Sequence, residues 1–298
     1  MSGERALARK GILLVGGTGS RLHPVTLGIS KHLLPVYDKP MAYYPLSVLM
    51  LAGIKEVLVV TTPEDALNYR RLFGDGTHLG MNLHYALQPH PGGIAEVFEI
   101  AAAFIGGSPV CLVLGDNIFY GQGFTPLLQS VSAREEGATL FAYPVKDPHR
   151  FGIVSLDENG LVGELEEKPD HFVSSLAVTG LYFFDGNVVE ISAGIKPSSR
   201  GEKEIIDVLK AYRDRDVLAA EVLGRGFVWL DAGTPETLLE AGVLVQAVEQ
   251  RQGLKIACLE EIAWRAGWVT EDQVMSRADE LEGTAYSEYL INLLHPEG

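Results

Sequence analysis

The amino-acid sequence predicts an α/β protein with a doubly wound, mostly parallel central sheet. Apolar runs of five or six residues end near glycine or proline, helical patterns separate these runs, and a glycine-rich turn follows the first of them. Fully apolar runs are typical of strands that are buried on both faces of a parallel sheet. Strands and helices in alternation then indicate that helices cover both sides of that sheet.

The first half of the chain contains the apolar runs and two helical patterns. Strands are expected over residues 11–15, 55–60, 110–114 and 138–143. One helix is predicted over residues 43–52, where Gly53 provides a left-handed cap. A second helix is predicted over residues 94–105, which are apolar on all sides and are followed by Gly106 and Gly107.

After residue 150 the pattern changes, because apolar and polar residues alternate. Strands are expected over residues 151–156, 161–165 and 177–184, with a turn at 157–160 between the first two. Alternation of this kind favours a mixed or antiparallel elaboration of the sheet. One more strand, over residues 227–230, ends at Asp231.

The C-terminal part of the chain is predicted to be helical. Thr234 as the N-cap and Pro235 at the first helical position begin a helix that extends to about Gln252. A capping-box pattern from Thr270 to Gln273 predicts a later helix. No internal repeat, low-complexity stretch or Pro/Ser-rich linker interrupts the chain, so one continuous domain is expected.

Composition and charge exclude several classes of protein. The chain has 24 lysines and arginines against 39 aspartates and glutamates, a formal net charge of −15, and no basic block. Such a chain repels nucleic acid and anionic membrane surfaces, so neither is an expected partner. No stretch approaches 18 apolar residues, and the first ten residues lack the apolar core of a secretory signal. Cys111 and Cys258 have apolar neighbours, which predicts reduced, buried thiols in a cytoplasmic protein.

The glycine-rich turn after the first strand indicates an anion-binding site. Three of its four positions are glycine: Gly16, Gly17 and Gly19. Their backbone N–H groups can approach phosphate closely, and Arg21 adds a planar fork that suits phosphate oxygens. Leu22 replaces the third glycine of a dinucleotide fingerprint, and the Gly-Lys-Ser/Thr end of a P-loop is absent. A tight strand-to-helix turn is the alternative, but Lys31, ten residues after Arg21, adds a second cation for a triphosphate.

Asp116 and Asp231 each follow an apolar strand. Ligands of open α/β sheets bind outside the carboxyl ends of the strands. Two carboxylates brought together there could hold one Mg²⁺, a hard cation that prefers oxygen ligands and bridges phosphate oxygens. Each aspartate could instead cap a turn, and a separation of 115 residues leaves both interpretations open.

Several segments, in the same order along the chain, resemble the sugar-1-phosphate nucleotidyltransferases. The segments are GGTGSRLHPVT (16–26), SKHLLPVYDKPMAYYPLSVLMLAGI (30–54), GDNIFYG (115–121), EEKP (166–169), VTGLYFFD (178–185), SRGEKEIID (199–207), WLDAGT (229–234) and QGLKIACLEEIAWRAGW (252–268). The resemblance covers nearly the whole chain and implies one domain over residues 1–298 with a Rossmann-like nucleotidyltransferase fold. It divides that domain into a nucleotide-binding half (11–150), a sugar-phosphate-binding half (151–234) and a helical C-terminal part (235–298).

The resemblance implies a reaction and its cofactor. The members that this chain is most similar to transfer the nucleotidyl group of dTTP to glucose 1-phosphate, with Mg²⁺, and form dTDP-glucose and pyrophosphate. The metal ligands of the family fall on Asp116 and Asp231. Arg21 matches the arginine that binds the triphosphate, and Lys31 matches the lysine that stabilises charge at the α-phosphate.

The resemblance also assigns the base pocket and the sugar pocket. Gln88 and Gly93 match residues that bind the thymine edge, and an amide suits an imide because it both donates and accepts. Glu167 matches a residue that binds sugar hydroxyls, while Lys168 and Arg200 match residues that bind the sugar phosphate. From the sequence alone, residues 166–169 could equally be a solvated, charged strand end. The remaining residues of the implied sugar pocket are Gly152, Val178, Gly180 and Tyr182.

Six positions depart from the pattern of the family, of which Val15 in place of alanine and Ser20 in place of threonine are mild changes. His32, Gly92, Glu96 and Ile206 occupy sites where glutamine, aspartate, glutamine and threonine are usual. His32 and Glu96 are expected close to the nucleotide. A carboxylate near a triphosphate is unfavourable, which leads to the hypothesis that Glu96 pairs with His32.

Three alternatives to this function stay open from the sequence. A related enzyme could use UTP or another sugar 1-phosphate. A nucleotide-sugar-dependent glycosyltransferase also has strand-end aspartates, but it would lack a glycine-rich turn followed by a lysine. A non-catalytic nucleotide-sugar sensor is expected to lose Arg21, Lys31 or one of the aspartates, and all four residues are present.

The resemblance further implies a homotetramer. In the family, a feedback site for a dTDP-sugar lies between subunits. The residues that match its walls are Tyr120, Gly121 and the helices from about residue 235 onward. The sequence itself supports only an apolar helical tail that can pack against a partner.

Overall fold

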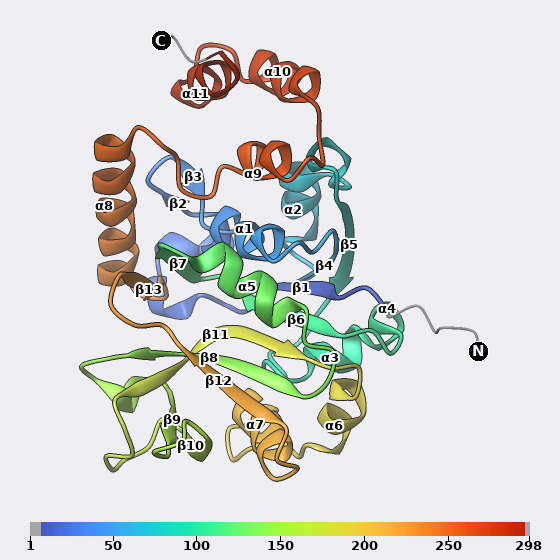
Figure 1. The fold of residues 1–298 in the computed structure, drawn as a ribbon, viewed down its shortest axis with the longest axis vertical. Coiled ribbons are helices and arrows are strands. Elements are labelled where there is room, and N and C mark those ends of the chain that lie inside the picture. The colour runs from blue at the N-terminus through green and yellow to red at the C-terminus, as the bar shows by residue number, and fades with distance from the viewer. Residues whose placement is uncertain (1–6, 296–298) are drawn as a thin grey trace.

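The protein is described by a computed structural model over residues 7–295 (Figure 1). The two ends of the predicted domain, residues 1–6 and 296–298, lie outside the described residues. The expectation that the first ten residues contain no secretory signal therefore falls mostly outside them. A central sheet runs through the molecule with helices on both of its faces. The last two helices lie at the end of the molecule that is opposite strands β9 and β10.

One sheet of nine strands forms the centre of the molecule. Its strands are β1 (Lys10–Val15), β4 (Glu56–Thr61), β5 (Asn82–Leu87), β6 (Val110–Leu114), β8 (Ala138–Pro144), β9 (Gly152–Leu156), β10 (Val162–Glu167), β11 (Leu176–Phe184) and β12 (Leu218–Val222). Seven of them lie in the order β10-β9-β11-β6-β1-β4-β5, and β8 pairs with both β11 and β12. Strands β6, β1, β4 and β5 are parallel, whereas β11 is antiparallel to β6, β8 and β9. The predicted fold class, a doubly wound sheet with a mixed elaboration, is confirmed.

Helices cover both faces of this sheet. The described α-helices are α1 (Tyr43–Leu51), α2 (Ala66–Phe73), α3 (Val97–Ile100), α4 (Ala102–Ile105), α5 (Phe124–Ser132), α6 (Val188–Gly194), α7 (Ile205–Arg213), α8 (Pro235–Gln252), α9 (Leu259–Arg265), α10 (Glu271–Glu280) and α11 (Ala285–Leu294). Helices α1, α2, α5, α9, α10 and α11 contribute to one core, and α3, α4, α6 and α7 contribute to the other. Helix α8 closes a third, smaller core.

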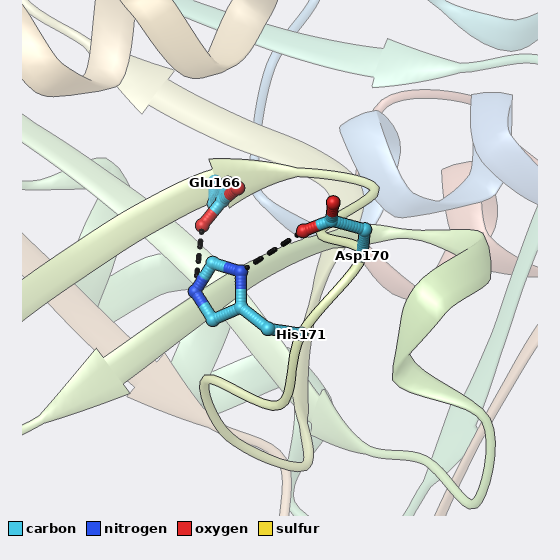
Figure 2. A group of neighbouring side chains, drawn as sticks. All are labelled: Glu166, Asp170 and His171. Atoms are coloured by element: carbon cyan, nitrogen blue, oxygen red, sulfur yellow. Dashed lines mark hydrogen bonds and ion pairs between the residues drawn. The ribbon is translucent and has the colours of Figure 1, made fainter.

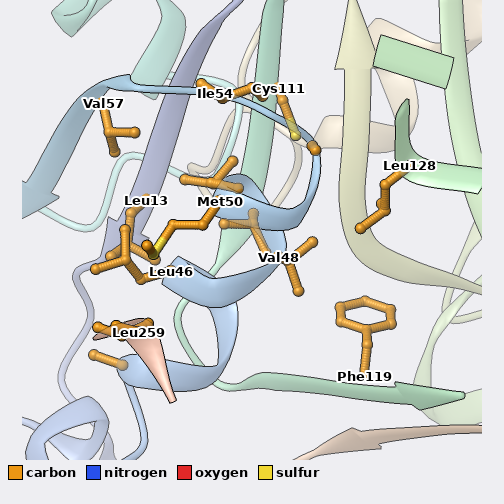
Figure 3. Close-up of a cluster of buried hydrophobic side chains, with 14 of the residues drawn as sticks. Leu13, Leu46, Val48, Met50, Ile54, Val57, Cys111, Phe119, Leu128 and Leu259 are labelled. Carbon is orange, nitrogen blue, oxygen red and sulfur yellow. The ribbon is translucent and has the colours of Figure 1, made fainter. Parts of the chain in front are cut away.

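The two cores explain why the central strands are apolar throughout. Successive side chains of a strand point to opposite faces of the sheet. Leu13, Val57 and Cys111 therefore belong to one core, around helix α1, as Figure 3 shows, whereas Ile12 belongs to the opposite core with Phe98. All five side chains are completely buried. Burying a side chain of this size stabilises the fold by about 1.5–3 kcal/mol.

Most elements predicted in the first half are confirmed, with one break. Helix α1 ends just before Gly53, which has the expected positive φ of 80°. The helix predicted over residues 94–105 is instead split into α3 and α4 at Ala101, where φ is −87° and ψ is 0°, outside the helical range. The backbone N–H of Ala95 donates a hydrogen bond to the carbonyl of Lys203 at 3.1 Å. This hydrogen bond to the second half of the chain keeps the first residues of the predicted helix, 94–96, out of α3.

Two small sheets complete the fold. Strand β13 (Phe227–Asp231) pairs antiparallel with β7 (Asn117–Gly121), and β2 (Pro35–Val36) pairs with β3 (Lys39–Pro40). The expectation that Asp231 ends a strand is therefore correct, but that strand lies outside the central sheet. In the β7–β13 pair, Asp231 lies opposite Asn117.

The C-terminal helices begin as predicted. Thr234 and Thr270 cap α8 and α10 with reciprocal side-chain and backbone hydrogen bonds, and α8 ends at Gly253. Cys111 and Cys258 are free and buried, and burial raises the pKa of both thiols. Among the helices of residues 7–295, none is both long and apolar enough to cross a bilayer. The prediction of one domain with three parts stays a prediction.

Candidate active site

Two cavities of about 640 and 490 Å³ lie side by side at the carboxyl ends of β1 and β6. We call them the first and the second cavity. Leu14, Gly16, Ile94 and Glu202 line both. In the second cavity, the structure brings together twelve of the residues predicted from the sequence: Gly16, Arg21, Lys31, Asp116, Gly152, Glu167, Lys168, Val178, Gly180, Tyr182, Arg200 and Asp231. The first cavity contains Gly17, Gln88 and Gly93 as well as Gly16.

The glycine-rich turn forms the wall where the two cavities meet. Gly17 has a φ of 99° and Gly19 a φ of 60°, both in the left-handed region that favours glycine. Gly19 lines neither cavity; its carbonyl accepts hydrogen bonds from the Thr26 hydroxyl at 2.7 Å and from the Leu22 N–H at 2.9 Å. Gly19 therefore shapes the turn that carries Arg21.

Asp116 is an ionised carboxylate at the end of β6. Lys31 forms an ion pair with one of its oxygens, and the Asn117 side chain donates a hydrogen bond to the other at 3.0 Å. Burial alone would raise the pKa of Asp116, but the charge of Lys31 and the hydrogen bonds from Lys31 and Asn117 hold the pKa well below its usual range. Asp116 therefore keeps its negative charge at neutral pH.

Asp231 differs from Asp116 because one of its oxygens has no hydrogen-bond partner within residues 7–295. Its Oδ1 is buried and accepts no hydrogen bond from the described part of the chain. Burial and then the charge of Asp116 raise the pKa of Asp231 to about 6. The guanidinium of Arg21 lies near this carboxylate, with Gly233 next to both groups. A Cβ built on Gly233 would lie 2.9 Å from Oδ1 of Asp231 and 2.5 Å from Nη2 of Arg21. A buried, unpartnered oxygen next to a second carboxylate fits a hard divalent cation, which prefers oxygen ligands.

On the far side of the second cavity, a carboxylate lies between two cations. Glu167 ends β10, and its Oε1 lies 3.4 Å from both Lys168 Nζ and Arg200 Nη2. Arg200 also pairs with Glu204 at 2.9 Å. Lys168 has a φ of 46°, so the chain turns sharply where the strand ends. The predicted sugar-phosphate residues thus lie next to each other.

Asn117 holds this wall together and was missed by sequence reasoning. Its Oδ1 accepts hydrogen bonds from the N–H of Gly180 at 2.8 Å and from the indole N–H of Trp229 at 2.6 Å. A Cβ on Gly180 would come within 2.7 Å of the Asn117 side chain, so only glycine fits there. Trp229 packs against Tyr143 and Phe151. The Asp-Asn pair is visible in the sequence, but its partners are not.

In the first cavity, Gln88 and Gly93 are neighbours. Gln88 follows β5, and its Nε2 donates to the carbonyl of Gly93 at 3.2 Å and to Oε2 of Glu96 at 2.8 Å. Gly93 has a φ of 98°, and a Cβ on it would lie 2.4 Å from the carbonyl oxygen of Lys203. Only glycine fits at this position. The two residues predicted to bind a base edge therefore form one unit.

A model of the nucleotidyl transferase family matches residues 10–247. The match spans most of the chain and contains every candidate site residue. The chain belongs to this family. The enzyme class that the sequence predicts, a nucleotidyltransferase, is thereby confirmed.

Individual relatives of this transferase are similar over nearly their whole length. The glucose-1-phosphate thymidylyltransferase of Neisseria gonorrhoeae is 56% identical over 285 residues, which cover 96% of this chain and 99% of that protein. The enzyme of the same name from Neisseria meningitidis is 54% identical with the same coverage. A solved structure of a candidate glucose-1-phosphate thymidylyltransferase from Bacillus anthracis superposes with a TM-score of 0.74 at 38% identity, covering 80% of this chain and 95% of that chain.

The hypothesis that Glu96 of the transferase pairs with His32 is wrong. Glu96 accepts a hydrogen bond from Gln88 instead, and His32 Nδ1 lies 3.3 Å from the Ser30 hydroxyl. Burial, with a smaller contribution from Lys31, lowers the pKa of His32 to about 3. His32 is therefore neutral at pH 7 and has no charge for a carboxylate to balance.

Several residues of the two cavities had no signal in the sequence. Arg150 lines the second cavity, and its charge lowers the pKa of Asp231 against the stronger effect of burial. Glu202 lines both cavities, and Asp65 and Asn68 line the first. Each is a single polar residue in a loop or helix, and no spacing rule marks it.

A separate group of possible metal ligands lies on the surface near the end of β10. Figure 2 shows Glu166, Asp170 and His171, the one group of three ligand-type side chains found close together within residues 7–295. His171 lies 3.1 Å from Asp170 and 3.5 Å from Glu166. Its hydrogen bond to Asp170 and the charge of Glu166 raise the pKa of His171. The contacts of His171 with these two exposed carboxylates account for the group, so it does not indicate a metal site.

Proposed function

We propose that this transferase is a glucose-1-phosphate thymidylyltransferase, which converts dTTP and glucose 1-phosphate into dTDP-glucose and pyrophosphate. One observation carries the proposal: the two cavities share the wall at Gly16, and the cations Arg21 and Lys31 line the second cavity beside the two aspartates. A nucleotide with its base in the first cavity would reach this cluster with its phosphates. The identity of 54–56% to enzymes of that name supports the same reaction.

The nucleotide is proposed to lie along the glycine-rich turn. Gln88 and Gly93 bind the base edge, and the backbone of Gly16 and Gly17 approaches the phosphates. Arg21 binds the triphosphate and stabilises the departing pyrophosphate. Lys31, now paired with Asp116, lies where it can also stabilise charge that develops at the α-phosphate.

The sugar phosphate is proposed to bind in the second cavity. Glu167 accepts hydrogen bonds from sugar hydroxyls, and Lys168 and Arg200 hold the phosphate. The walls around the sugar are Gly152, Val178, Gly180 and Tyr182. This arrangement supplies a hydroxyl acceptor next to two phosphate-binding cations.

The reaction is a direct displacement at phosphorus. An oxygen of the sugar phosphate forms a bond to the α-phosphorus, and the bond from that phosphorus to the pyrophosphate oxygen breaks. The electron pair leaves with the pyrophosphate, and no covalent enzyme intermediate is needed. Catalysis therefore consists of positioning the two substrates and stabilising negative charge.

Asp116 and Asp231 are proposed to hold Mg²⁺. When bound, the ion supplies positive charge to the α-phosphate and the leaving group. This contribution matters because the chain has a net charge of −15 and must bind two phosphorylated substrates. Arg21 and Lys31 supply the remaining local positive charge.

Pyrophosphate release from the purified protein tests the proposal. The assay combines Mg²⁺ with dTTP, UTP, dCTP or ATP, and with glucose 1-phosphate or other sugar 1-phosphates. Rapid release with dTTP and glucose 1-phosphate is the expected result. Faster release with another pair would keep the chemistry and change the substrate, and no release with any pair would contradict the proposal.

We further propose a cytoplasmic homotetramer with a feedback site for a dTDP-sugar. A third cavity of about 540 Å³ supports the site; it lies between β7, α5 and the segment from Gln252 to Ala266, and Tyr120, Gly121 and Arg265 line it. Light scattering tests the tetramer. Inhibition by a dTDP-sugar that is weakened in Arg265→Ala, with unchanged KM for dTTP, tests the site.

A further inference from the structure

Glu96 lies behind Gln88 and outside both cavities. Oε2 of Glu96 accepts a hydrogen bond from Nε2 of Gln88 at 2.8 Å, and the carbonyl oxygen of Gly93 lies 3.2 Å from the same nitrogen. Gln88 lines the first cavity, whereas Glu96 lines neither. Both hydrogens of the Gln88 amide are therefore used by the protein.

A carboxylate at this position fixes which end of the amide faces the cavity. It can only accept hydrogen bonds, so Gln88 must turn its nitrogen toward Glu96. Oε1 of Gln88 then lies on the side of Gly16, 3.2 Å from the position of a Cβ on that glycine. No donor within residues 7–295 is bonded to this oxygen. Gln88 thus offers the first cavity an acceptor and no donor.

Glycine at position 92 leaves room for the carboxylate. A Cβ on Gly92 would lie 2.3 Å from both Cδ and Oε2 of Glu96. The φ of Gly92 is not positive, so its backbone would tolerate a side chain. The three atoms nearest to such a Cβ all belong to the Glu96 carboxyl group. Gly92 and Glu96 are therefore coupled by packing.

We propose that Glu96 is a positioning residue that sets the base specificity through Gln88. With only Oε1 facing the base, Gln88 favours a pyrimidine whose N3 carries a hydrogen, as in thymine and uracil, over cytosine, whose N3 is an acceptor. A site built to pair with one polar edge rejects a base that leaves that edge unpaired. The inference rests on the proposed function for the binding of a base in the first cavity.

Glu96→Gln tests the inference because it keeps the size of the side chain and removes the constraint. A neutral amide both donates and accepts, so Gln88 becomes free to turn. The ratio of kcat/KM for dTTP to that for dCTP is expected to fall about tenfold, the scale for one hydrogen bond to a charged group. The change should appear as a higher KM for dTTP, with kcat and the KM for glucose 1-phosphate unchanged.

Two further variants separate positioning from loss of charge. Glu99→Gln removes the same charge one turn away, where Glu99 pairs with Lys203, and should leave the ratio unchanged. Gly92→Ala keeps the charge of Glu96 but displaces its carboxylate from Gln88, so the ratio should fall as it does in Glu96→Gln. If Glu96→Gln does not fold, Gly92→Ala decides the question.

Calorimetric binding of dTTP and dCTP distinguishes failure of this inference from failure of the proposed reaction. A wild-type protein that prefers dTTP in binding but releases no pyrophosphate would contradict the reaction alone, and the binding ratio would still test Glu96. A ratio unchanged in both Glu96→Gln and Gly92→Ala would overturn the inference. So would a wild-type protein that binds the two nucleotides equally well.

Discussion

Asp231 lies opposite Asn117, the neighbour of Asp116, and this strand pairing brings two carboxylates from distant parts of the chain into one cavity. The backbone N–H of Ala232 donates to the carbonyl of Asp116 at 2.9 Å, so the backbone fixes their approach. Lys31 pairs with Asp116, whereas a buried oxygen of Asp231 accepts no hydrogen bond from any residue that the structure describes. Of the two carboxylates, Asp231 is therefore the one with a buried oxygen still available to a cation.

Asp231→Asn is expected to affect stability and activity in opposite directions. In the metal-free protein the variant removes a buried charge that Asp116 repels, so the melting temperature should rise by about 2 °C or more. Mg²⁺ should raise the melting temperature of the wild type, because an ion that binds the native state stabilises that state. The variant should lose this increase, because it no longer binds the ion. Turnover should fall on the order of 10²-fold. Calorimetric melting with and without MgCl₂ measures the first two effects.

Asp214→Asn is the matched control for this change. Asp214 is 63% exposed, pairs with Arg213 and lies outside both cavities, so neither the melting temperature nor its response to Mg²⁺ should change. If Asp231→Asn keeps the full response to Mg²⁺, Asp231 is not a metal ligand. If it destabilises the metal-free protein, the carboxylate of Asp231 has a structural role, and its charge is not a source of strain.

Arg21→Ala is expected to lower kcat on the order of 10²-fold, the scale for losing one preorganised charge donor. Arg21 is exposed on the glycine-rich turn, so the variant should still fold. Arg21→Lys retains the charge without the planar fork and should recover part of the rate. Pyrophosphate release under saturating substrates measures all three proteins, and a near-normal rate for Arg21→Ala would count against its role.

Gly152→Ala is expected to impair sugar-phosphate binding selectively. A Cβ at this position would lie 2.8 Å from Cδ1 of Ile206 and 3.1 Å from Oε2 of Glu167, so the sugar-side carboxylate must shift. The KM for glucose 1-phosphate should rise about tenfold or more, while the KM for dTTP stays unchanged. Ile206→Val removes Cδ1 and should partly rescue Gly152→Ala. Equal changes in both KM values would indicate a general loss of structure instead.

Local signals predict the parallel part of the fold well. The apolar runs that became β1, β4 and β6 are continuous because helices bury both of their faces, and the cap at Thr234 is a side-chain bond within four residues. Strand β5 had no such signal. Among the described strands it pairs only with β4, and it exposes Asn82 and His84, so its residues do not form an apolar run.

The site was predictable where residue types alone carry the chemistry. Glycines in a turn and aspartates after strands are recognisable in a single chain, and resemblance supplied their roles. The contacts of Asn117 and the pairing of Gln88 with Glu96 were not predictable, because both depend on how loops fold back in three dimensions. The hypothesis that Glu96 pairs with His32 failed for the same reason. Burial, which depends on the three-dimensional fold, keeps His32 uncharged, and the hypothesis required a charged His32.

A cluster of four charged side chains also escaped sequence reasoning, because two of its members lie at least 210 positions before the other two. It joins the β2–β3 hairpin to the end of α8 and consists of Asp38, Lys39, Glu249 and Lys255. Lys39 lies 2.9 Å from Glu249, and its side chain is 1% exposed, so carboxylates take the place of water around its ammonium group. Lys255 pairs with Asp38 and lies 3.6 Å from Glu249.

Asp38→Asn is expected to lower the free energy of unfolding at pH 7 by about 1–2 kcal/mol, a value reduced by the partial exposure of the carboxylate. Burial raises the pKa of Asp38, but the hydrogen bonds from Lys255 and Lys39 outweigh burial and hold the pKa below its usual value.

A carboxylate with a lowered pKa stabilises the folded state above the pKa of the unfolded chain, and this contribution is lost as the pH falls through the folded pKa. The difference between wild type and variant in urea unfolding should therefore be constant from about pH 7 to pH 5 and shrink only below about pH 4. A difference that has already vanished at about pH 5 would mean that the lysines do not lower the pKa of Asp38.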